Sequence, residues 1–247
     1  MMTKGMQIKL FSVALAILVS CTQYGHAQNN KAKLVVKFET MANNKPLVLG
    51  DSGYVNEFAE SYTITRLKYY ISNISLGQKI NSPASTEVFL VDAAHEDSIS
   101  IWAWPGLYTK MIFTLGIDSA LNNSGAQDGA LDPLNGMFWT WNSGYVYFKM
   151  EGFSNASTAD LQRIEHHIGG YQGPNKAVRQ IELNLQQPLI INEGDQKEMT
   201  VVLNLDKYWK GQNDISIASK ALIMIPGEWA KKSADNFPGM FTVKIVK

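Results

Sequence analysis

Apolar side chains recur at every second position along much of this chain. Leu34, Val36 and Phe38 alternate with charged neighbours, which is typical of a strand that buries one face. The same period of two indicates further strands at residues 111–115, 145–150, 181–185, 199–205 and 241–245. These segments predict a protein built largely from half-buried strands.

One of the predicted strands changes face along its length. Tyr69 and Ile71 share one face, whereas Ile74 falls on the other. One extra residue in a strand shifts the alternation in this way, because two residues then oppose a single residue of the partner. We therefore predict a β-bulge near Ser72 and Asn73.

Helical periodicity is scarce, and it predicts short helices only at residues 157–163, 206–210 and 228–235. Strands separated by Gly, Asn, Pro and Ser clusters favour an all-β fold, either an antiparallel β-sandwich or a barrel-like domain with long loops. No repeat of fixed period and no internal linker divides the chain. The sequence predicts one domain at residues 33–247, preceded by a short linker at residues 28–32.

The most unusual stretch of the chain leads into a cluster of aromatic residues. Residues 116–133 are too polar and too rich in glycine for a strand, so we predict a long loop, which in a compact domain is often functional. Asp118 and Asp132 favour turns and are expected to shape this loop. If the next segment is extended, three side chains share one face: Met137, Trp139 and Trp141. They either fill a core or line a soft aromatic pocket at the exit of the loop.

The amino-acid composition excludes several classes of structure and of binding partner. The chain has 22 basic and 22 acidic residues among 247, with 45% hydrophobic residues, which argues against disorder. A neutral chain without a basic run also lacks the cationic surface that nucleic acids require. The single cysteine, Cys21, excludes a disulfide framework and a zinc–thiolate site within one chain.

The cysteine belongs to an N-terminal leader. Two lysines precede a short apolar run, which is too short to span a bilayer and indicates a signal peptide at residues 1–27. The sequence LVSC at residues 18–21 resembles a lipobox, in which Cys21 becomes the lipidated N-terminus. Small residues at 25–27 offer a second cleavage point that would release a soluble protein. Either route predicts a location in a bacterial cell envelope, in the periplasm or anchored to the outer membrane by N-terminal lipid alone.

Adjacent histidines are the main candidates for metal ligands. His166 and His167 face opposite sides of an extended segment, so both could bind one ion only from an irregular backbone. His166 shares its face with apolar neighbours and is also compatible with a buried core histidine. The chain has no nucleophile elbow, zinc-protease helix or phosphate-binding loop, and we expect no enzymatic activity.

Several blocks taken together resemble the MbnP-like family of bacterial periplasmic copper-binding proteins. The blocks are TITRLKYYISNI at 63–74, GIDS at 116–119 leading to DP at 132–133, GMFWTWNSGY at 136–145, HHIGG at 166–170 and ADNF at 234–237. The resemblance covers nearly the whole chain after the leader, and the tryptophan-containing block is its most specific part.

The resemblance implies a copper-binding protein of the cell envelope that works with a di-haem partner of the cytochrome c peroxidase type. In relatives, that partner is thought to oxidise a tryptophan to kynurenine, whose amine binds copper together with histidine. By motif match, Trp139 and Trp141 are the candidates for the modified residue, with His166 or His167, and Met137, as its neighbours in the copper site. Some relatives carry a histidine shortly after the first strand, where this chain has Thr40, so copper binding here is altered or lost if that ligand is essential.

A binding module without metal is the alternative function. Exposed aromatic rings stack on sugars or peptides, and a neutral chain is compatible with a glycan. The candidate rings are Trp102, Trp104, Trp139 and Trp141.

Overall fold

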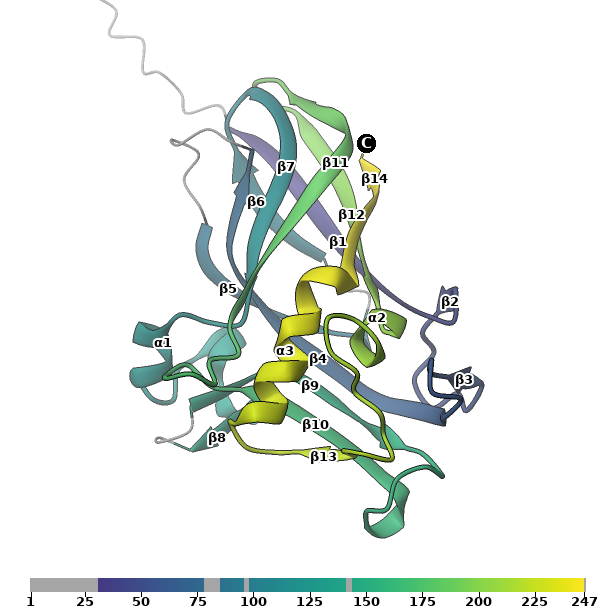
Figure 1. Cartoon of the computed structure of the whole chain (residues 1–247). Helices are drawn as coiled ribbons and strands as arrows, with labels where there is room; N and C mark the ends of the chain where they lie inside the picture. Colours follow the sequence, from purple (N-terminus) through teal and green to yellow (C-terminus); the bar gives the residue numbers. More distant parts are fainter. Residues whose placement is uncertain (1–30, 78–84, 96–97, 141–143, 247) are drawn as a thin grey trace, which may run out of the picture.

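The computed structural model describes residues 31–77, 85–95, 98–140 and 144–246, which form two sheets with short helices beside them (Figure 1). The smaller sheet is built around β1 (Ala32–Ala42), which pairs with β12 (Gln196–Asn204) on one side. On its other side β1 pairs with β6 (Ser98–Ala103) and β2 (Lys45–Pro46). The last strand, β14 (Phe241–Val246), joins β12.

The larger sheet has the strand order β11-β7-β4-β9-β10-β13. Its strands are β11 (Arg179–Ile191), β7 (Gly106–Leu115), β4 (Ser61–Leu76), β9 (Gly144–Phe153), β10 (Arg163–Gly169) and β13 (Leu222–Ile223). Three short strands attach to this order. β3 (Tyr54–Val55) and β5 (Ser85–Asp92) pair with β4, and β8 (Phe138–Thr140) pairs with β9.

The predicted all-β sandwich is confirmed, but its sheets are mixed. β1 runs parallel to β12, and β10 runs parallel to β13, whereas the other named pairs are antiparallel. A tight hairpin forces its two strands to be antiparallel, and neither of these pairs is joined by one. A period-two pattern reports which face of a strand is buried and carries no information on the direction of its partner.

Aromatic side chains hold the two sheets together. Phe38 of β1 meets Tyr69 of β4 edge-on at a ring-centroid distance of 6.2 Å. Phe241 of β14 meets Phe113 of β7 at 5.3 Å, also edge-on. Edge-to-face pairs at these separations add to the free energy gained by burying the rings. The strands predicted from the alternation of apolar and polar residues therefore contribute side chains to one core between the two sheets.

The predicted bulge is confirmed in β4. The pairing register with β5 shifts between Ser72 and Ile74, and the register with β7 shifts between Ser72 and Ser75. Asn73 has a φ of 52°, a left-handed conformation that asparagine tolerates better than most residues. Just before the bulge, Tyr70 and Ile71 are both fully buried, so β4 is covered on both of its faces there.

The helix predictions are mixed. α2 (Asp206–Trp209) and α3 (Glu228–Met240) are confirmed, and α3 extends beyond its predicted end. The predicted helix at 157–163 is wrong, because the segment holds only the 3₁₀ turn η3 (Asp160–Gln162) and then enters β10. Leu161 has a φ of 59°, and a left-handed residue interrupts a right-handed helix.

α2 and α3 cover part of the larger sheet, as Figure 1 shows for α3. Phe148 of β9 lies 5.3 Å from Tyr208 of α2 and 5.2 Å from Phe237 of α3, measured between ring centroids. Asp235 of α3 also forms an ion pair with Arg179 of β11. The face of β9 and β10 beneath these helices is consequently dry.

The close approach of β4 and β9 predicts a glycine requirement. A Cβ on Gly152 would lie 1.9 Å from the carbonyl oxygen of Thr63, and backbone atoms cannot yield as a flexible side chain can. We expect Gly152→Ala to lower the free energy of unfolding by at least about 2 kcal/mol, as overpacking does. Gly239→Ala is the control, because a Cβ there meets nothing within 4 Å. Urea denaturation of both variants measures the difference, and equal stabilities would contradict the expected clash.

Candidate functional site

The long segment before the tryptophans is an ordered loop that contains short helices. α1 (Ser119–Asn123) and the 3₁₀ turns η1 (Gly129–Leu131) and η2 (Pro133–Asn135) lie within it. Two tyrosines hold it against the larger sheet. The Tyr145 hydroxyl lies 3.0 Å from the carbonyl oxygen of Gly125 and 2.9 Å from that of Leu131, and the Tyr70 hydroxyl donates to Ala130. The loop is therefore fixed on the larger sheet by hydrogen bonds, although its residues are mostly polar and glycine-rich.

The two aspartates predicted to shape the loop cap its helical turns. Asp118 accepts a hydrogen bond from the backbone amide of Leu121 at the start of α1. Asp132 accepts one from the backbone amide of Leu134 at the start of η2. Each carboxylate is used as a cap, which is a common role for aspartate at a helix start. That the loop held by Asp118 and Asp132 shapes a binding site stays a prediction.

His166 is a core histidine whose two ring nitrogens are both occupied. Its Nε2 lies 2.9 Å from the carbonyl oxygen of Lys220, and its Nδ1 lies 2.6 Å from the hydroxyl of Tyr208. A carbonyl oxygen only accepts, so Nε2 carries the proton and Nδ1 accepts from the tyrosine. Burial lowers the pKa of His166 to about 4, so the ring is neutral. To bind a metal, His166 would have to give up one of these contacts.

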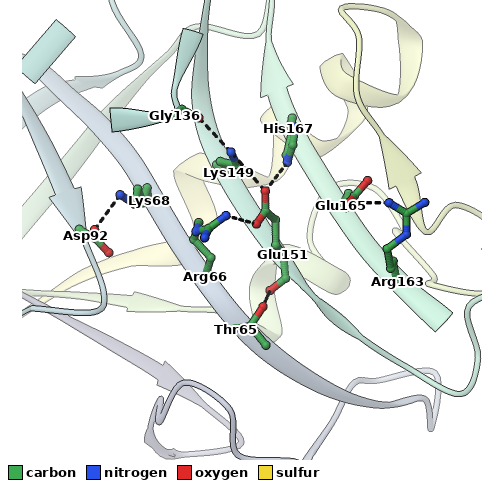
Figure 2. Close-up of polar contacts among 10 residues, drawn as sticks. All are labelled: Thr65, Arg66, Lys68, Asp92, Gly136, Lys149, Glu151, Arg163, Glu165 and His167. Carbon is green, nitrogen blue, oxygen red and sulfur yellow. Dashed lines mark hydrogen bonds and ion pairs between the residues drawn. The ribbon is translucent and has the colours of Figure 1, made fainter. Parts of the chain in front are cut away.

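His167 lies on the opposite face of β10, within a polar cluster (Figure 2). Its Nε2 lies 2.9 Å from Oε1 of Glu151 on β9. Lys149 and Arg66 also form ion pairs with Glu151, and Lys149 donates to the carbonyl oxygen of Gly136. The cluster thus ties the imidazole of His167 to the end of the long loop.

The cluster stabilises the charge on Glu151. The hydrogen bond to His167 contributes most, burial opposes it, and Lys149 and Arg66 add to the lowering, so the pKa of Glu151 falls to about 2. Because a carboxylate accepts, a neutral His167 carries its proton on Nε2 and its lone pair on Nδ1. Among the residues that the structure describes, no hydrogen bond engages that Nδ1. A carboxylate behind one nitrogen and a free lone pair on the other is the arrangement in which histidine commonly binds metals.

Trp139 packs against the end of β10, at Gly169. The six-membered ring of its indole comes within 2.8 to 3.0 Å of the position that a Cβ on Gly169 would take. Gly169 and His167 are two apart on β10, but the pairing register between β10 and β9 shifts between Ile168 and Gly169, so the strict alternation of faces does not extend to Gly169. The ring of Trp139 is partly buried and packs against the core. The structure thus brings Trp139 to the end of β10 that follows the two histidines, and it places His166 and His167 on opposite faces of that strand.

Of the remaining residues predicted for the site, the structure describes Met137 only. Met137 is fully buried, and its carbonyl oxygen accepts from the amide of Val146. Trp141 and the leader with Cys21 lie outside the described residues. In the described part, no group of three or more His, Cys, Asp or Glu is arranged to hold a metal. No helix among the described residues is long and apolar enough to cross a membrane.

Two residues of the cluster escape sequence reasoning, Lys149 and Glu151. Their alternation with Phe148 and Met150 marks them only as the polar face of β9. The contact with His167 depends on the register between β9 and β10, in which Lys149 stands opposite His167. No pattern within either strand specifies that register.

The low pKa of Glu151 predicts a pH-dependent contribution to stability. A depressed folded-state pKa stabilises the protein above the ordinary value of 4.5, and this is lost as the pH falls toward 2. We expect Glu151→Gln to cost about 1–3 kcal/mol in the free energy of unfolding at pH 7. Urea denaturation should show this cost shrinking between pH 5 and about pH 3.

Glu39→Gln is the matched control, because Glu39 pairs with Lys244 and both side chains are well exposed. Exposed pairs of this kind contribute less than about 1 kcal/mol. A cost for Glu151→Gln that stayed constant across the same pH range would rule out the assigned role of the carboxylate.

Comparison with known proteins identifies the family. A family model described as MbnP matches residues 31–225. MbnP from Methylosinus trichosporium is a similar solved structure, with 14% sequence identity, a TM-score of 0.49, and coverage of 75% of this chain and 80% of the other. No protein of curated function matches the chain. Since the family match spans most of the chain and includes Trp139, His166 and His167, the protein belongs to the MbnP family.

Proposed function

We propose that this protein is a non-enzymatic copper-binding protein of the bacterial cell envelope. The observation that carries the proposal is the position of the Trp139 ring over Gly169, two residues along β10 from His167. A nitrogen donor formed from Trp139 would thus arise close along β10 to an imidazole whose Nδ1 is engaged by no hydrogen bond among the described residues. Family membership supports the same conclusion, because the relatives it groups are the copper-binding proteins that the sequence resembles.

Imidazole, thioether and an aromatic amine are suitable copper ligands for a chain whose single thiol is predicted to be removed or lipidated. Cys21 is the single cysteine and is predicted to leave with the leader or to carry lipid. A site that prefers Cu(I) must then use imidazole, thioether or a modified side chain. His167 supplies the imidazole, with Glu151 fixing its orientation from behind. Met137 is the thioether candidate, and Thr40 cannot replace the histidine found near the first strand in some relatives.

An intact indole is a very poor ligand, so the proposed site requires a modified tryptophan. Removal of four electrons, with two oxygen atoms taken from water, opens the indole ring, and a third water then releases one carbon as formate, which gives kynurenine with a free aromatic amine. We propose that a di-haem partner of the cytochrome c peroxidase type supplies the oxidising equivalents. Trp139 is the candidate that the contact with Gly169 favours, and Trp141 is the alternative.

The copper proposal predicts a specific modification in protein purified from its native host. Peptide mass spectrometry should find kynurenine in place of Trp139, and the purified protein should retain copper. Trp139→Phe and His167→Gln should each release most of the copper, because each removes one nitrogen donor. The control Trp102→Phe alters an exposed ring on β6, with 65% of its surface accessible, and should leave the copper content unchanged.

The proposal is wrong if Trp139 and Trp141 are both unmodified and the purified protein retains no copper. Kynurenine at Trp141 instead of Trp139 would retain the copper function and reject the assignment of the residue. Lipid on Cys21 in the same digest would identify a lipoprotein.

A second function is favoured by the exposed aromatic residues of β6. Trp102 is 65% exposed, and the neighbouring Trp104 ring lies 4.8 Å from the ammonium of Lys31. Such rings stack on sugar faces. A glycan-binding module predicts signals on an array of envelope polysaccharides that disappear in Trp102→Ala. If the unsubstituted protein binds none of the polysaccharides on that array, the glycan-binding function is contradicted.

A further inference from the structure

A hollow of about 200 Å³ lies on the larger sheet, where β4 begins and β9 ends. Eight residues line it, and none of them carries a charge. One of them, Phe153, is 47% exposed and offers an aromatic ring. The side chains that offer hydroxyl or amide groups include those of Ser52, Ser61, Thr63, Asn155 and Gln162. We call this hollow the neutral pocket.

Strand pairing brings the aromatic ring and two hydroxyls to one face of the sheet. Thr63 of β4 stands directly opposite Phe153 of β9, and side chains of directly opposite residues project from the same face. Ser61 lies two residues before Thr63 and shares its face, because the register shift of β4 comes later, after Ile64. The floor of the neutral pocket is therefore a sheet surface that carries a ring beside hydroxyl groups.

The loop after β9 forms the rim of the pocket, and its backbone adopts an unusual conformation. Leu161 and Gln162 are consecutive residues with φ of 59° and 55°, in the left-handed region that is unfavourable for residues with a side chain. The carbonyl oxygen of Gln162 accepts from the amide of Ser154, and the Ser154 hydroxyl donates to the carbonyl oxygen of Ser61. These bonds hold the left-handed turn against the start of β4. Strained backbone of this kind is concentrated at functional sites.

The polar side chains of the neutral pocket are available to a ligand. Within the part of the chain that the structure describes, no hydrogen bond engages the side chains of Ser61, Thr63, Asn155 or Gln162. Two charged residues adjoin lining residues in the sequence, and both are paired. Arg163 forms an ion pair with Glu165, and Asp51 forms one with Lys45. The pocket thus offers neutral donors and acceptors beside a ring.

We propose that the neutral pocket binds a single neutral sugar ring. A pyranose has faces of C–H groups and a rim of hydroxyls, each of which both donates and accepts hydrogen bonds. One face stacks on Phe153, and the hydroxyl and amide groups of the pocket bond to the rim. A charged ligand would lose hydration here without gaining an opposite charge. The volume is below the roughly 300–1,000 Å³ of sites for drug-sized molecules, which favours one ring.

A peptide fits this position less well than a sugar. Extended peptides commonly bind by adding a strand to an open edge of a sheet. The pocket lies instead where β9 is flanked by β4 on one side and by β10 on the other. It is also separate from the exposed tryptophan of β6, a strand of the smaller sheet (Figure 1). The inference is independent of copper binding, because no residue that lines the pocket belongs to the proposed copper site.

Titration with neutral monosaccharides tests the proposal. The probes are glucose, galactose, mannose and N-acetylglucosamine, followed by the amide chemical shifts of isotope-labelled protein. We expect at least one probe to bind with a dissociation constant of about 1 mM and to shift the amides of Ser154, Asn155 and Gln162. Phe153→Ala and Asn155→Ala should each weaken binding at least several-fold. Trp102→Ala is the matched control, because it removes an exposed ring from the other sheet and should leave the affinity unchanged.

The uronic acid and the amino sugar with the same ring as the bound probe are the charged comparisons, and both should bind more weakly. A methyl glycoside of that probe separates two sources of the ring. Retained affinity indicates the end of a glycan chain, lost affinity indicates a free sugar, and either result supports a sugar site.

The absence of shifts with all four neutral sugars would overturn the proposal. Tighter binding of a charged sugar would also overturn it, as would a loss of binding in Trp102→Ala with full binding in Phe153→Ala. If Phe153→Ala fails to fold, the affinity of Asn155→Ala still decides, because Asn155 lies on an exposed part of the loop.

Discussion

Strand β10 is the element on which the rest of the structure depends, because its two faces meet entirely different surroundings. One face lies against the helices that follow β12, and its imidazole is fully dry and doubly hydrogen-bonded. The other face carries an imidazole held by a carboxylate within a network of charges. Adjacent residues in a strand must point in opposite directions. A pair of neighbouring histidines is therefore divided between two chemical roles by backbone geometry alone.

Much of this architecture could be predicted from the sequence, and the limits have physical causes. Alternation in segments such as 34–38 locates strands, and the parity change near Asn73 locates the bulge, because both are local consequences of burial. The parallel partner of β1 and the contact between His167 and Glu151 depend on register between distant strands. The helix predicted at 157–163 failed because two left-handed residues there overrule its local propensity.

The candidate site was predictable in its components but not in its geometry. The aromatic segment and the histidine pair are visible as motifs, yet the sequence leaves open which histidine accompanies Trp139. The contact of the indole with β10 depends on Gly169, because only a residue without a side chain leaves room for the ring at that point. The pairing register of β10 shifts just before this glycine, so alternation along the strand does not determine the face on which the ring lies. A contact that requires the absence of a Cβ atom cannot be recognised from the pattern of hydrophobic residues along the sequence.

The parallel pairing of β1 with β12 has a consequence for how the chain acquires its fold. Lys33 stands opposite Gln196, so the first strand finds its central partner only after most of the chain has been made. Contacts between such distant segments carry a large entropic cost of closure, and folds that depend on them form slowly. The nascent chain can pair β1 with β2 and β6 early, but it cannot complete its smaller sheet until β12 and β14 have been made. For a protein predicted to carry an export leader, that delay keeps the chain in the unfolded form that passage through a membrane channel requires.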